Sequence, residues 1–113
     1  MEHNPEFLKL VEGAKLSVQE VNVEQVSANS NNKTDFVLVD VREDSEWDKG
    51  HLPGAIHLGK GIIERDIEKA IPQKNKEIVL YCGGGFRSAL AAESIRKMGY
   101  SNVYSMAGGY RQW

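Results

Sequence analysis

Cys82 stands at the point where an apolar strand is expected to end and a helix to begin. Residues 77–81 before it are mostly apolar, and the residues after it read Gly83-Gly84-Gly85-Phe86-Arg87-Ser88. Backbone N–H groups at the start of a helix have no partner within the helix and stabilise anions. This position therefore favours the thiolate form of Cys82, which is the nucleophilic form of a cysteine.

The residues that follow Cys82 have the composition of an anion-binding loop. Gly83, Gly84 and Gly85 lack the Cβ atoms that would prevent a tight loop from turning its amides inward. After Phe86, Arg87 adds a fixed positive charge where the loop meets the helix. We therefore interpret residues 83–87 as a loop that binds and stabilises an anion beside the cysteine.

Two other interpretations of this segment are weaker. A lone cysteine is often only a small buried apolar side chain, but here strand, cysteine, glycines, arginine and helix follow one another in the order that an activated thiolate requires. A phosphate-binding loop of the nucleotide-binding type would need Gly-Lys-Ser/Thr after the glycines, and this sequence lacks it.

The elements around this loop alternate between short apolar runs and helix-like segments, which favours βαβ units and a parallel sheet. Strands are expected at residues 17–21, 36–39, 55–58, 77–81 and 103–106. Helices are expected at residues 22–29, 61–71 and 88–98, with a helical turn at 45–49 and a short helix from Gly108. Residues 1–16 are a lead-in segment with a helical pattern, and residues 17–113 are expected to form the domain.

Composition narrows the class of protein. The 113 residues carry 14 basic and 16 acidic side chains, a net charge of −2, so the basic face that nucleic acid requires is not expected. Apolar runs are too short to span a membrane, which predicts a cytoplasmic protein without a membrane partner. The single cysteine excludes an internal disulfide and a multi-cysteine metal site.

Three further polar residues attract attention because of their positions. Asp40 and Arg42 follow a strand that is expected to be buried on both faces, and chemistry or anchoring is expected at such strand ends. His51 lies in a turn-forming segment between two glycines. A metal role for His51 would need further ligands, and His3 and His57 do not stand at a metal-binding spacing from it. We expect neither a metal nor a cofactor.

The order of motifs resembles that of the rhodanese sulfurtransferases. The matching segments are Asp40-Val41-Arg42, residues 47–55, residues 82–88, and Gly108-Gly109 with Trp113. The resemblance implies an α/β fold, with a central parallel five-stranded sheet and helices on both faces. It also implies that Cys82 is catalytic and that Gly83, Gly84, Gly85, Phe86 and Arg87 bind its persulfide. Asp40, Arg42 and His51 would then be structural.

Loop length separates two branches of this resemblance. Phosphatase-like relatives, which act on phosphate or arsenate, have five residues between the cysteine and the arginine. Here only four residues separate Cys82 from Arg87. The tighter ring resembles the sulfur-transferring form, so we rank sulfur transfer above phosphate or arsenate chemistry.

The resemblance implies a thiosulfate sulfurtransferase. Cys82 would take a sulfane sulfur from a donor such as thiosulfate and pass it to cyanide or a thiol. The alternative is a persulfide carrier that delivers sulfur to one protein in a sulfur relay. Arg87 is the only basic side chain of the loop itself. The glycines and Phe86 are expected to make the mouth of the site neutral and open, which disfavours a strong preference for thiosulfate and leaves space for a bulky donor or a protein acceptor. Lys60 and Arg65 are expected on a solvated helix face.

Overall fold

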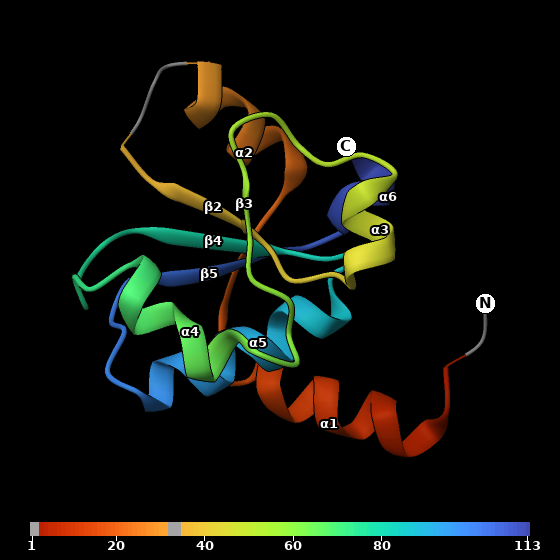
Figure 1. Ribbon diagram of the computed structural model, residues 1–113. Helices are drawn as coiled ribbons and strands as arrows, with labels where there is room; N and C mark the ends of the chain where they lie inside the picture. The colour runs from red at the N-terminus through yellow and green to blue at the C-terminus, as the bar shows by residue number, and fades with distance from the viewer. Residues whose placement is uncertain (1–2, 32–34) are drawn as a thin grey trace.

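The computed structural model describes residues 3–31 and 35–113 (Figure 1). Five parallel strands form one sheet in the order β1-β5-β4-β2-β3, which confirms the expected α/β fold. The strands are β1 (Gln19–Val21), β2 (Val37–Asp40), β3 (Ile56–His57), β4 (Ile78–Tyr81) and β5 (Val103–Met106). The helices are α1 (Pro5–Lys15), α2 (Val23–Asn31), α3 (Asp44–Asp48), α4 (Ile63–Ala70), α5 (Phe86–Lys97) and α6 (Gly109–Gln112).

Helices cover both faces of this sheet because its central strands are apolar on both sides. Alternate residues of β4 pack into different clusters: Ile78 and Leu80 face α4 and α5, whereas Val79 and Tyr81 face α2 and α6. Side chains alternate across a strand, so a strand buried on both faces reads as a continuous apolar run. In Figure 1, α1, α4 and α5 lie on one side of the sheet, and α2, α3 and α6 on the other.

Helix boundaries follow the expected local signals with small differences. The side chain of Asn22 accepts the N–H of Gln25 (2.7 Å), and the side chain of Gln25 accepts the N–H of Asn22 (2.8 Å), so the expected cap of α2 is present. Helix α2 continues to Asn31, beyond the expected end at residue 29. Helix α5 begins at Phe86 rather than Ser88, because Gly85 adopts a left-handed conformation (φ 97°) and starts the helix earlier.

The carboxyl ends of the parallel strands place the motifs at one edge of the sheet. Asp40 at the end of β2 pairs in register with Tyr81 at the end of β4, so the residues that follow each strand lie near one another. Strand β5 ends on the other side of β4 and leads through Gly108 into α6. This edge carries the loop after Cys82.

Helix α1 packs against α5 through its buried residues Val11 and Ala14. It precedes β1, and residues 1–2 of the lead-in segment lie outside the described part of the chain. The domain boundary expected between residues 16 and 17 stays a prediction. Along residues 3–31 and 35–113, no helix is long and apolar enough to cross a membrane. The cytoplasmic location also stays a prediction.

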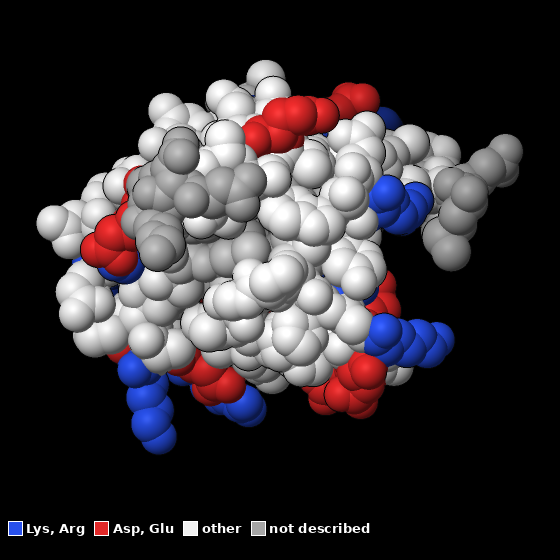
Figure 2. All heavy atoms as spheres, turned by 90° about the horizontal axis from the view of Figure 1, so that it is seen from above, with Lys and Arg blue, Asp and Glu red and all other residues white. Residues whose placement is uncertain are grey.

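The molecular surface shows no continuous patch of one charge on the face drawn in Figure 2. Basic and acidic side chains are scattered around its periphery, and a broad uncharged area lies between them. Such a face offers no track of positive charge for a phosphate backbone.

Candidate active site

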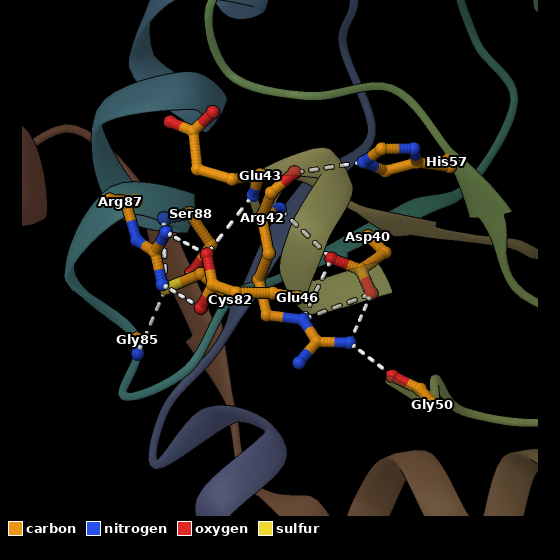
Figure 3. A network of polar contacts seen from close by, with 10 residues as sticks. All are labelled: Asp40, Arg42, Glu43, Glu46, Gly50, His57, Cys82, Gly85, Arg87 and Ser88. Carbon is orange, nitrogen blue, oxygen red and sulfur yellow. Dashed lines mark hydrogen bonds and ion pairs between the residues drawn. The ribbon is translucent and has the colours of Figure 1, made fainter. Parts of the chain in front are cut away.

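The Cys82 sulfur lies under the first turn of α5, as the sequence predicts. Its Sγ accepts the backbone N–H of Gly85 at 3.2 Å and the backbone N–H of Ser88 at 3.4 Å (Figure 3). Cys82 is only 1% exposed, and it is one of the residues that line the pocket described below. Two main-chain donors converging on a buried sulfur stabilise negative charge on it.

The donors differ in part from those expected. Of the expected loop amides of residues 83–87, the one within hydrogen-bonding distance of Sγ is that of Gly85. The second donor is Ser88, which sequence reasoning left out of the loop. The Ser88 hydroxyl lies 3.6 Å from Sγ and 2.8 Å from the Ser105 hydroxyl of β5, and both serines are fully buried. The position of Ser88 directly after Arg87 is a local signal that could have placed it at the sulfur. Ser105 has no such signal, because the pairing of β5 with β4 brings it to the site.

Helix α6 holds the carbonyl groups of the loop. The N–H of Tyr110 donates to the Cys82 carbonyl (2.8 Å), and the N–H of Arg111 donates to the Gly83 carbonyl (3.0 Å). The carbonyl groups of Cys82 and Gly83 thus point toward α6, and the amide of Gly85 points toward the sulfur. A Cβ atom on Gly109 would contact the Cys82 carbonyl and lie 2.7 Å from the Gly83 carbonyl carbon, so only glycine allows this approach.

Arg87 forms a two-point ion pair with Glu46 of α3. Its terminal nitrogens lie 2.7 and 3.0 Å from the two carboxylate oxygens of Glu46. These hydrogen bonds lower the pKa of Glu46 from its usual 4.5 to about 2, although partial burial opposes the change. The pKa of Arg87 is raised by the same pair. Arg87 therefore joins the loop to α3, and Glu46 offsets much of its charge.

Replacing Glu46 with glutamine is expected to make the protein less sensitive to acid. Folding lowers the pKa of Glu46, so the carboxylate stabilises the folded state above pH 4.5, and this contribution is lost as the pH falls toward 2. The pair is about one-third exposed, so solvent screening limits the contribution to about 1 kcal/mol. Urea unfolding at pH 7, 4 and 3 should show the difference between wild type and Glu46→Gln shrinking as the pH falls. An equal difference at all three pH values would contradict the assignment.

Asp40 and Arg42 form a buried ion pair beside the loop (Figure 3). A terminal nitrogen of Arg42 lies 2.8 Å from Asp40 Oδ2 and also donates to the Gly50 carbonyl at 2.7 Å. Asp40 is 0% and Arg42 5% exposed. The guanidinium of Arg42 lies 4.3 Å from the ring centre of Tyr110. The pair thus links the end of β2, the turn after α3, and α6.

His51 takes part in an aromatic stack. Its ring lies parallel to that of Trp47 at 3.5 Å between ring centres, and the ring of His57 lies 4.9 Å from Trp47. His57 Nε2 lies 2.8 Å from the carbonyl oxygen of Arg42. The contact of His51 with Trp47 is typical of a side chain that packs within the fold. No group of three or more potential metal-ligating side chains occurs within the described ranges 3–31 and 35–113.

A pocket of about 600 Å³ opens above the Cys82 sulfur. Its wall includes loop residues Gly84, Phe86 and Arg87 and also residues that sequence reasoning missed, namely Arg111, His3, Asn4 and Phe7. A Cβ atom on Gly84 would lie 3.3 Å from a terminal nitrogen of Arg111, so this guanidinium lies over the loop. The loop itself supplies only Arg87, as expected, but Arg111 of α6 adds a second guanidinium to the pocket wall. Arg65 pairs with Asp66 on an exposed surface, as expected.

Comparison with known proteins agrees with this geometry. The family model "Rhodanese-like domain" matches residues 22–113, and the chain belongs to this family. It is 33% identical over 81 residues to the thiosulfate sulfurtransferase GlpE of Coxiella burnetii, with 72% of this chain and 74% of GlpE aligned. It is 31% identical over 97 residues to the putative sulfur carrier protein YrkF of Bacillus subtilis. That alignment covers 86% of this chain but only 51% of YrkF.

Among solved structures, the chain is similar to RPA3614 of Rhodopseudomonas palustris, described as a protein of unknown function and possible tyrosine phosphatase. The TM-score is 0.83 at 27% identity, with 100% of this chain and 93% of the other covered. The likeness therefore includes α1, which lies outside residues 22–113 matched by the family model.

Proposed function

We propose that this protein is a sulfurtransferase that carries a sulfane sulfur on Cys82 as a persulfide. The observation that carries the proposal is the Cys82 sulfur beneath the amides of Gly85 and Ser88, at a pocket, in a chain of the rhodanese-like family. The similarity to GlpE supports thiosulfate as a donor.

The first half of the reaction loads the cysteine. The Cys82 thiolate attacks the outer sulfur of thiosulfate, a new sulfur–sulfur bond forms to Cys82, and the sulfur–sulfur bond of the donor breaks. Its electron pair leaves with sulfite, a stable anion, so this step needs no proton donor. The main-chain donors around the cysteine stabilise the anionic persulfide, as an oxyanion hole does for an oxygen anion.

The second half of the reaction unloads the cysteine. Cyanide or a thiolate acceptor attacks the outer sulfur of the persulfide and takes it, and the electron pair of the broken bond returns to Cys82 as a thiolate. Thiolate is regenerated in the same hydrogen-bonded position, ready for another donor.

A persulfide carrier in a sulfur relay is the second candidate, and the similarity to YrkF favours it. The two functions differ in kinetics. A free-standing enzyme turns over thiosulfate with cyanide or small thiols, whereas a carrier is slow with these acceptors and fast with its protein partner.

Phosphatase chemistry ranks lower, in spite of the description given to RPA3614. Only four residues separate Cys82 from Arg87, and the Arg87 side chain is engaged by Glu46. We therefore expect no phosphate release from aryl phosphates.

Intact-mass measurement tests the proposal directly. After incubation with thiosulfate, the protein is expected to gain the mass of one sulfur atom, and cyanide should remove that mass. Thiocyanate should form in the same amount. Failure to gain sulfur from any sulfane donor would overturn both the enzyme and the carrier assignment.

A further inference from the structure

The N-terminal segment before the family-matched region forms one wall of the active-site pocket. His3, Asn4 and Phe7 line the pocket together with Phe86 of the loop. The ring centre of His3 lies 4.8 Å from that of Phe86 and 5.3 Å from that of Phe7. The rings of Phe7 and Phe86 lie 6.3 Å apart. These three side chains form an aromatic wall beside the cysteine.

The aromatic wall is held in place by the packing of α1 on α5. Helix α1 runs along α5, as Figure 1 shows, and buries Val11 and Ala14 against it. The ammonium group of Lys15 lies 5.2 Å from the ring centre of Phe86. Contacts with α5 and Phe86 therefore position α1 relative to the pocket.

A cation lies at the loop side of the same pocket. Arg111 lies over Gly83 and Gly84, 3.4 and 3.3 Å from the Cβ positions of these glycines. Among the residues that the structure describes, no carboxylate lies within 4.0 Å of the Arg111 guanidinium, whereas Arg87 is paired with Glu46. Arg111 is thus better placed than Arg87 to attract an anionic donor.

The size of the pocket exceeds what inorganic thiosulfate requires. A volume of about 600 Å³ falls within the range of roughly 300–1,000 Å³ typical of sites for small organic molecules. Thiosulfate, with no apolar part, would leave the aromatic wall uncovered. A donor with an anionic end and an aromatic group would contact both Arg111 and the aromatic wall.

Building on the proposed sulfur transfer at Cys82, we propose that His3 and Phe7, with Phe86 and Arg111, select organic sulfane-sulfur anions that carry an aromatic group over inorganic thiosulfate. Aryl thiosulfonates are the chemical class that fits. The Cys82 thiolate attacks the outer sulfur, the new bond to Cys82 forms, and the sulfur–sulfur bond of the donor breaks. The electron pair leaves with the aryl sulfinate, so no oxidant or reductant is consumed.

The test compares kcat/KM for benzenethiosulfonate and for thiosulfate, with cyanide as acceptor, in wild type and in Phe7→Ala. The ratio of kcat/KM for benzenethiosulfonate to kcat/KM for thiosulfate is expected to fall about tenfold in Phe7→Ala, which corresponds to about 1.4 kcal/mol of differential binding. Leu10→Ala is the matched control, because Leu10 is on the same helix but is 65% exposed and outside the pocket wall. Its ratio should equal that of wild type. Arg111→Ala should lower kcat/KM for both donors.

These measurements distinguish a failure of the proposed donor selectivity from a failure of the proposed sulfur transfer. If wild type loads sulfur from thiosulfate but the ratio is unchanged in Phe7→Ala, the selective wall is wrong and sulfur transfer stands. If wild type prefers thiosulfate to the aryl donor, the inference is also overturned. If neither donor loads Cys82, the proposed function itself fails.

Discussion

Cys82→Ser is expected to abolish sulfur loading and to lower turnover by at least about a thousandfold, the scale seen when a nucleophile is removed from other enzymes. A serine hydroxyl stays protonated near neutral pH and does not form the persulfide, because its oxygen lacks the nucleophilicity of a thiolate toward sulfur. The measurements are kcat/KM with thiosulfate and cyanide, and intact mass after incubation with the donor.

The control for this variant is its folding stability. Serine differs from cysteine by one atom, and its hydroxyl can accept the same N–H groups of Gly85 and Ser88. The free energy of unfolding should therefore stay within about 2 kcal/mol of the wild-type value. A folded Cys82→Ser protein with near-wild-type turnover would refute the assignment of Cys82 as the nucleophile.

Asp40→Asn is expected to destabilise the protein by about 3–5 kcal/mol, the cost of leaving a buried charge without its partner. The substitution keeps the shape of the side chain but removes the negative charge beside Arg42, and both residues are almost fully buried. Small domains are stable by only about 5–15 kcal/mol, so the loss is large. Urea unfolding at pH 7 measures it.

A matched control for this variant is Asp66→Asn. Asp66 also pairs with an arginine, Arg65, but on the surface, where solvent screening leaves such pairs with little effect on stability. If Asp40 is structural, folded Asp40→Asn protein at low temperature should still load sulfur, because Asp40 is not among the residues that line the pocket. Full stability combined with loss of loading would instead indicate a chemical role.

Much of the candidate site was predictable because its signals are local in the chain. The strand, Cys82, the glycines and the helix are consecutive, and helix geometry alone places the amides of the first turn near the end of the strand. The cap formed by Asn22 and Gln25 is equally local. The start expected for α5, residue 88, lies two residues after the observed start, because Gly85 is the cap of the helix rather than part of the loop.

The pairing of Arg87 could not be derived from the loop itself. The sequence indicates an arginine that adds charge beside Cys82, but α3 brings Glu46 to the guanidinium from 41 residues away. This contact adds a link between the loop and α3 to the positive charge that Arg87 supplies beside Cys82. No local pattern around either residue encodes the distance between them.

The sequence by itself determined the class of fold and the position of the loop that follows Cys82, since alternating apolar runs specify a parallel sheet and adjacent glycines specify a tight turn. Only the tertiary structure decided what surrounds the sulfur beyond that loop. Ser105, Arg111 and Phe7 reach the site from β5, α6 and α1. The positions of these side chains depend on how the helices pack on the sheet and on each other. Packing geometry is a property of the whole folded chain rather than of any short segment.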